Sequence, residues 1–150
     1  MEVLYEGYIP CVPPGAICDI VYVFWRKYLE RIGELGRVVI EEGVDRWYEG
    51  QYFEMNLCRY KIFPGGFRED IKFGKLRVES IWQENKSYVR LLGSYWGKTQ
   101  EEYNRYIDAK NKIIGLLDDL RIFATRHCGE VEIRVIVIMF IEQRIKVRLV

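Results

Sequence analysis

The sequence predicts a single α+β domain over residues 1–150, in which a curved, mainly antiparallel sheet of about six strands packs against two long helices. Three observations indicate this fold class. Stretches with the two-residue period of strands occupy the start and the middle of the chain, and two longer stretches repeat apolar residues at helical spacing. No Pro/Gly/Ser-rich linker divides the chain, and 49% of its residues are apolar, which is enough for a sizeable core.

Strand and helix patterns alternate in the first part of the chain. Residues 2–9 alternate as a first strand, which Pro10 ends. Residues 17–35 then repeat apolar side chains along one helical face, and Gly36 is the expected residue just beyond the helix. This helix is rich in aromatic residues, so we expect it to be buried on more than one side. A short strand over 37–42 follows.

Three antiparallel strands of a meander are expected in the middle of the chain. The first covers 52–63, and a hairpin with its tip at 85–86 leads into the last, 87–96. The apolar phase changes by one residue at 57–58 and again at Gly74, and each change predicts a β-bulge or a bend. Repeated bulges predict a strongly curved sheet.

The second long helix has the most specific local signal in the sequence. Residues 99–102, TQEE, form a capping box, in which Thr99 covers the amide three residues on and Glu102 reaches back. From there the apolar residues keep helical spacing to about His127, and Gly129 is the expected stop.

The stretch 131–141 predicts the central strand of the sheet. Its odd positions are apolar, and from Val135 to Ile141 the even positions are apolar too, so both faces of this strand should be covered. From 131 to the C-terminus, twenty extended residues would span roughly 66 Å, whereas a compact domain of this length is only ~40 Å across. We therefore expect 142–150 to leave the domain as an intersubunit strand arm; a turn or a sharp bend near 142–143 is the alternative.

The balance of residue types bears on the source and location of the protein. A net charge of +1 argues against a surface wholly committed to nucleic acid but allows a local basic patch. Ser, Thr, Asn and Gln are scarce, while Glu, Arg, Lys, Ile, Val and Tyr are plentiful. This predicts a hyperthermophilic archaeon or its virus as the source. No apolar run suits a membrane span and no leader pattern starts the chain, so we expect a cytoplasmic protein, in the host cytoplasm if viral.

The four cysteines have no spacing typical of a zinc site, so we expect no metal bound by cysteine alone. Cys11 and Cys18 flank the rigid Pro-Pro-Gly run 13–15 and are the candidate disulfide pair. Disulfides do occur inside hyperthermophilic cells. The alternative is four buried thiols that act as small hydrophobic side chains.

We expect a non-catalytic interaction or assembly protein that needs no cofactor. No Gly-rich phosphate loop is present, and His127, the only histidine, already has an explanation as a cation at a helix C-terminus. The expected partner is a second copy or another protein, bound through the C-terminal strand and an aromatic cluster. The expected partner-binding residues are Trp47, Tyr48, Tyr52, Phe53, Arg144, Ile145, Lys146, Val147 and Arg148.

Two carboxylates and a lysine also suit a divalent metal site. Asp70 lies at the start of one predicted strand, and residues 84–86, Glu-Asn-Lys, form an acidic-x-Lys triplet further on. With the element order helix, meander, helix and strand, this pattern is similar to the core of the restriction-endonuclease-like nucleases. The resemblance implies a metal-dependent nuclease as the alternative function. In it, the metal ligands are Asp70 and Glu84, the positioning amine is Lys86, and the extra ligand is Glu34 or Glu30.

A nucleic-acid-binding protein without catalysis is the remaining alternative. Arg144, Lys146 and Arg148 share one face of the predicted terminal strand, and Arg90 and Lys98 border the aromatic pair 95–96. Strands that present cations and aromatic rings bind single-stranded nucleic acid by phosphate contacts and base stacking. A strand with one apolar face also needs a polar outer face simply to remain in solution.

Overall fold

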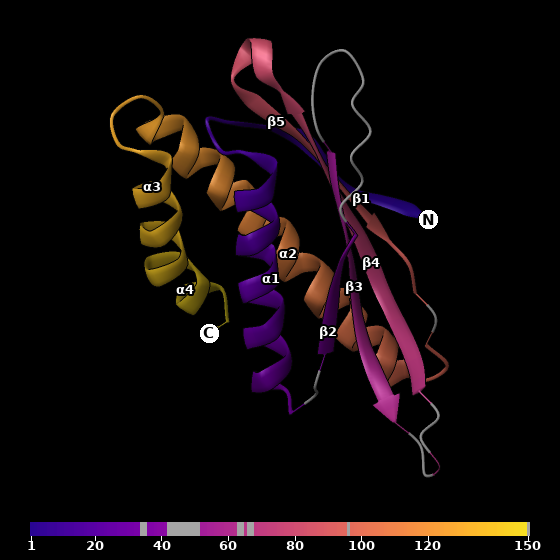
Figure 1. Cartoon of the computed structure of the whole chain (residues 1–150). Helices are drawn as coiled ribbons and strands as arrows, with labels where there is room; N and C mark the ends of the chain where they lie inside the picture. The colour runs from indigo at the N-terminus through magenta and orange to yellow at the C-terminus, as the bar shows by residue number, and fades with distance from the viewer. Residues whose placement is uncertain (34–35, 42–51, 63–64, 66–67, 96, 150) are drawn as a thin grey trace.

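The computed structural model describes residues 1–33, 36–41, 52–62, 65, 68–95 and 97–149, and it confirms the α+β class (Figure 1). One antiparallel sheet has the strand order β1-β5-β4-β3-β2. The strands are β1 (Glu2–Pro10), β2 (Gly36–Glu41), β3 (Tyr52–Ile62), β4 (Arg68–Ile81) and β5 (Lys86–Gly93). The helices are α1 (Pro14–Arg31), α2 (Gln100–His127), α3 (Ile133–Phe140) and α4 (Lys146–Leu149), with a 3-10 turn at Trp82–Glu84 and a π turn at Ile141–Ile145.

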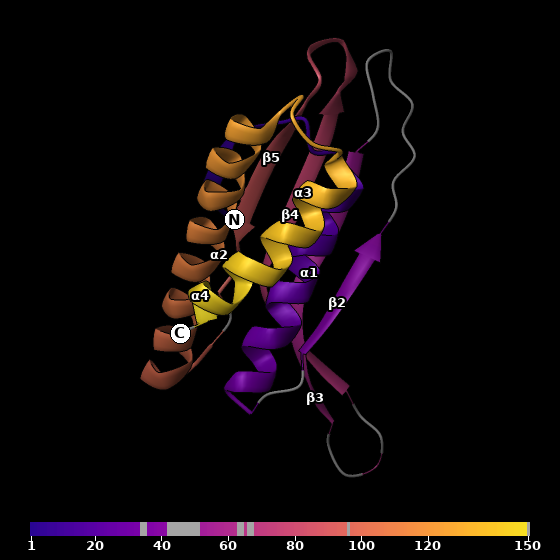
Figure 2. The same ribbon diagram turned by 90° about the vertical axis from the view of Figure 1, so that its left-hand side faces the viewer.

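The helices all lie on one side of the sheet. α1 contacts β2, β3 and β4, while α2 contacts β1. Figure 2 shows α3 and α4 lying across α1 and α2 on the side away from the sheet, where they contact α2. The core therefore fills the space between the sheet and the first two helices, and the C-terminal helices close it from outside.

The first strand and the meander meet at β5. α1 carries the chain from β1, at one edge of the sheet, to β2 at the opposite edge, and the chain returns strand by strand until β5 pairs with β1. The register of that pair joins Glu2 to Gly93 and Pro10 to Lys86. β4 is thus the middle strand of the described sheet.

Both predicted irregularities of the meander are one bulge. Leu57 of β3 pairs with Gly74 of β4, but Cys58 pairs with Lys72, so Phe73 is left over as the extra residue. A Cβ atom on Gly74 would lie only 2.5 Å from the carbonyl oxygen of Leu92 on β5. A glycine is needed here because the neighbouring backbone comes too close for any side chain.

The capping box at the start of α2 is confirmed. Thr99 has extended backbone angles, and its Oγ1 accepts a hydrogen bond of 3.1 Å from the amide of Glu102. The Glu102 carboxylate reaches back and accepts from the amide of Lys98 at 3.2 Å. The N-terminus of this 28-residue helix is therefore fixed by its own sequence.

Replacing Thr99 by Ala should lower the free energy of unfolding by about 1 kcal/mol, because the amide of Glu102 loses its acceptor. Urea denaturation measures the change. Thr125→Ala is the matched control on the same helix. The Thr125 hydroxyl donates to the carbonyl of Arg121, a bond that adds little to helix stability, so this change should be nearly neutral. Equal losses for both variants would contradict the capping role.

The predicted central strand at 131–141 is wrong, because this stretch is helical. α3, the π turn and α4 run without a break from Ile133 to Leu149, and the sheet has five described strands rather than about six. Residues 135–141 are apolar at every position, and such a run satisfies the two-residue and the 3.6-residue period equally well. Seventeen helical residues span only ~25 Å. This is less than the ~40 Å width of a compact domain of this size, so the reason to expect a strand arm over 142–150 no longer applies.

Candidate interaction surfaces

The helix α3 buries one side and exposes the other, although its sequence, IRVIVIMF, has a single charged residue. Ile136 and Phe140 are buried, and the Phe140 ring meets the Phe123 ring of α2 with centroids 5.8 Å apart. On the outer side, Val135 is 39% exposed and Ile138 is 49% exposed. A helix that is apolar all round normally lies in an interior. The described chain buries only one side of α3 and leaves apolar side chains on the other side in contact with solvent.

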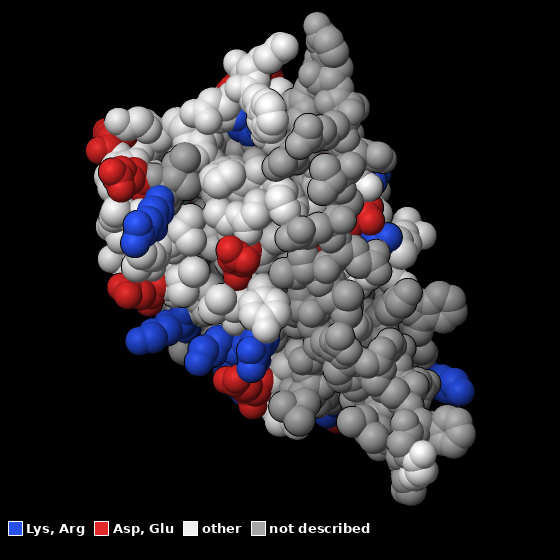
Figure 3. Space-filling model, viewed as in Figure 1, with Lys and Arg blue, Asp and Glu red and all other residues white. Residues whose placement is uncertain are grey.

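The exposed side of this segment forms a regular stripe. Val135, Ile138 and Glu142 follow one another at intervals of three and four residues, which keeps them on one face of the helix, and the exposed Val131 lies just before its N-cap, Glu132. We call Val131, Val135 and Ile138 the α3 stripe; Val131 is 37% exposed. Figure 3 shows broad uncharged areas between scattered charges on the side of the molecule where α1 and α3 lie.

Two charged residues flank the α3 stripe at equal distances from Ile138. Arg134 lies four residues before it and Glu142 four residues after it, and both side chains are exposed. Within the part of the chain that the structure describes, neither takes part in an ion pair. Both charges are therefore available to a second molecule.

The opposite side of the molecule is the open face of the sheet, which no described helix covers. Arg77 of β4 lies 3.0 Å from Glu54 and 2.9 Å from Glu79, and its guanidinium stacks 4.2 Å from the centre of the Tyr52 ring. Burial alone would lower the pKa of Arg77, but hydrogen bonds and charges from Glu79 and Glu54 outweigh it and raise this pKa. Arg77 thus remains a cation whose charge is already matched.

Three more cations of the open face lie near a carboxylate, among the side chains that the structure describes. Lys75 lies 3.8 Å from Glu54, and Arg90 lies 4.0 Å from Glu6. Lys86 lies 2.7 Å from Glu84 and 4.1 Å from the centre of the Tyr8 ring. A nucleic-acid phosphate would have to replace a carboxylate at each of these positions, so the described cations of the open face do not favour a polyanion.

The three residues of the nuclease alternative do not come together. Asp70 lies near the start of β4, where it pairs with Tyr60, whereas Glu84 lies in the turn beyond the other end of that strand. At about 3.3 Å per residue, the intervening strand separates them by roughly 35 Å. Glu84 and Lys86 form an ion pair with each other, and Glu30 lies 3.9 Å from Lys27. Glu34 lies outside the described residues.

The ranges that the structure covers contain no group of three or more His, Cys, Asp or Glu side chains that could hold a metal ion. His127 is half-buried. The centres of its ring and the Phe123 ring are 4.5 Å apart, and its Nδ1 lies 3.8 Å from a carboxylate oxygen of Glu130. These contacts give the histidine a structural place at the end of α2.

The predicted partner-binding residues are scattered. Trp47 and Tyr48 lie outside the described residues, Tyr52 lies on the open sheet face, and Phe53 packs against the core. In the C-terminal segment, Ile145 is buried, Lys146 and Val147 are exposed, and Arg148 bonds to Asp119. Arg144 lines a groove described below. A helical reading of this stretch would have found the α3 stripe, because the spacing of three and four residues from Val135 to Glu142 is visible in the sequence.

The predicted pairing of Cys11 with Cys18 is wrong, because Cys11 is bonded to Cys128 at the end of α2, with 5.7 Å between the Cα atoms. Cys18 lies inside α1 with its side chain turned into the core, and burial together with the charge of Asp19 raises the pKa of its thiol to about 12. Cys58 is also a buried thiol outside the disulfide. Sequence spacing suggested the nearest pair, but the fold brings together residues that lie 117 positions apart.

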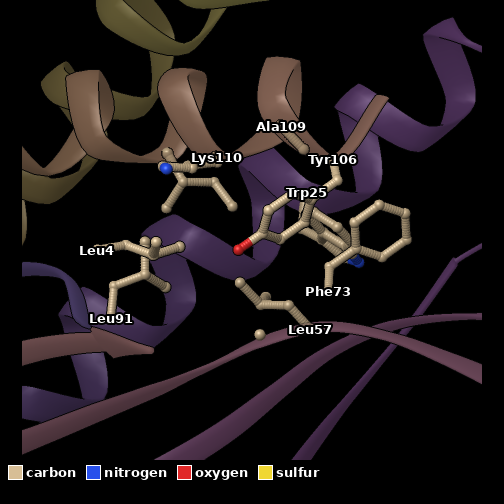
Figure 4. A pocket seen from close by; sticks show the side chains of 10 residues that line it. Leu4, Trp25, Leu57, Phe73, Leu91, Tyr106, Ala109 and Lys110 are labelled. Carbon is tan, nitrogen blue, oxygen red and sulfur yellow. The ribbon is translucent and has the colours of Figure 1, made fainter. Parts of the chain in front are cut away.

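The void in the described part of the core is too small for a ligand. Figure 4 shows the side chains that surround a void between α2 and the sheet, among them Trp25, Tyr106 and Lys110. This void measures about 10 Å³, which holds no more than one water molecule. The described residues also contain no helix that is long and apolar enough to cross a membrane.

Comparisons with known protein families, with curated proteins and with solved structures found no match. The surfaces described above therefore carry the functional argument by themselves.

Proposed function

We propose that this protein is a non-catalytic assembly protein that associates with a second copy of itself through the α3 stripe. The exposed apolar side of α3 carries this proposal, since a helix without a polar face needs cover on all sides. The separation of Asp70 from Glu84 and the paired cations of the open sheet face leave enzyme and nucleic-acid functions with less support.

Charge complementarity favours a second copy over an unrelated partner. If two α3 helices pack antiparallel about a two-fold axis at Ile138, Arg134 of each copy lies opposite Glu142 of the other. This follows because both residues lie four positions from the axis. The two-fold axis repeats this contact, so the dimer would have two Arg134–Glu142 ion pairs at the rim of an apolar interface. The stripe is short, so we expect a weak dimer with a Kd on the order of 10–100 µM.

The oligomeric state tests the proposal. Sedimentation velocity of the full-length chain from about 1 µM to about 1 mM should show a reversible monomer–dimer equilibrium in the expected range. Ile138→Asp should abolish the dimer, because two desolvated carboxylates would meet at the axis. A chain that stays monomeric at the highest concentration would contradict the proposal.

A charge swap identifies the partner as an antiparallel second copy. Arg134→Glu and Glu142→Arg should each raise the Kd by about tenfold, because each places like charges together twice. The double variant should restore the wild-type Kd. Unchanged melting temperatures would show that the monomer is intact. If the double variant dimerises no better than either single one, the antiparallel arrangement is wrong.

A further inference from the structure

A small groove lies between α2 and the π turn, and no residue of the α3 stripe lines it. It is lined by Asp119, Ile122, Phe123, Arg126 and Arg144 and has a volume of about 180 Å³. Two of its walls are arginines that come from different elements, Arg126 from the last turn of α2 and Arg144 from the π turn. We call this hollow the arginine groove.

The two arginines of the groove have no carboxylate partner. Asp119, the one acidic residue in the lining, is taken by Arg148, whose guanidinium nitrogens lie 2.6 and 2.8 Å from Asp119 Oδ2. Within the described part of the chain, neither Arg126 nor Arg144 forms an ion pair. The groove therefore carries two uncompensated positive charges, in contrast to the matched cations of the open sheet face.

The π turn explains why Arg144 lines the groove. A π turn adds a residue to the helical repeat, which rotates the side chains that follow relative to those before it. Ile145 is consequently buried at 3% exposure, while Arg144, its neighbour, borders α2. Single π turns inside helices are frequent at functional sites.

We infer that the arginine groove binds a phosphate monoester with a small apolar body. Guanidinium forks match the oxygens of phosphate, and two forks suit its three terminal oxygens better than the two of a carboxylate. Ile122, which is 43% exposed, and Phe123 supply an apolar wall for the rest of the ligand. A hollow of this size takes one phosphate group and a small body, not a nucleic-acid strand.

Isothermal titration calorimetry of the protein with phenyl phosphate tests this inference. We expect saturable binding, with inorganic phosphate binding more weakly because it lacks the apolar body. Arg126→Ala and Arg144→Ala should each weaken binding by about tenfold or more, and Arg144→Lys should recover only part of the loss, because lysine keeps the charge but not the fork.

Lys146→Ala is the matched control, since Lys146 is an exposed cation in the same segment that does not line the groove. It should leave the affinity unchanged. Equal weakening by Lys146→Ala, or no weakening by Arg144→Ala, would overturn the inference. Single-stranded DNA that binds more tightly than phenyl phosphate through the same arginines would overturn the ligand class. The monomeric Ile138→Asp variant should still bind, so the groove and the dimer are tested separately.

Discussion

Reduction of the Cys11–Cys128 disulfide should lower the free energy of unfolding by about 4–5 kcal/mol. The bond links residues 117 positions apart, and a cross-link that closes a loop of this length removes much conformational entropy from the unfolded chain. Urea denaturation with and without a thiol reductant measures the difference. Since small domains are stable by only about 5–15 kcal/mol, the reduced protein should be close to unfolding at moderate temperature.

Two controls accompany this experiment. The double variant Cys11→Ser/Cys128→Ser should match the reduced wild type and lose all sensitivity to reductant. Thiol counting in denaturant without reductant should find two thiols per chain, those of Cys18 and Cys58. Four thiols, or a stability that ignores the reductant, would show that the chain does not form this bond.

Replacing Phe140 by Ala should cost about 3–5 kcal/mol, whereas Ile138→Ala should cost less than about 1 kcal/mol. Phe140 is fully buried against Phe123, so its removal leaves a cavity between α2 and α3. Ile138, two residues before it, is half exposed, and alanine favours a helix more than isoleucine does. Urea denaturation at about 1 µM, where the proposed dimer is dissociated, gives both values.

This pair of variants also separates the helix from the strand that the sequence suggested. A central strand would bury both faces, so both changes would be costly. Only a helix docked on one side makes Phe140 essential and Ile138 nearly dispensable. Comparable losses at the two positions would contradict the helical arrangement.

Local signals in the sequence were predictive wherever the local residues decide the structure. The capping box at 99–102 fixes a helix start, and the phase changes at 57–58 and Gly74 mark a bulge, because turn and cap geometry depend on a few neighbouring residues. The prediction for 131–141 failed because 135–141 has no polar residue to set a phase, so packing against α2 selects the helix.

The candidate sites depended on long-range contacts and were less accessible to sequence analysis. The prediction of partner-binding residues included Arg144, but nothing in the sequence joins it to Arg126, since that neighbourhood exists only after α2 and the π turn pack together. The disulfide needs residues from both ends of the chain. The spacing behind the proposed Arg134–Glu142 match is visible in the sequence once the helix from Ile133 onward is known.

The position of β1 has a consequence for how the chain folds. β2 to β5 pair with their immediate neighbours in sequence, but β1 pairs with β5 in a register that joins Glu2 to Gly93 and Pro10 to Lys86, roughly 75–90 residues apart. Pairings between strands so far apart in sequence form late, because the intervening chain must lose conformational entropy before the strand contacts can form. The meander is thus expected to form first, and the outer edge of β5 stays unpaired until β1 docks. Until β1 docks, that edge can pair with a strand of another chain, which is a route to aggregation.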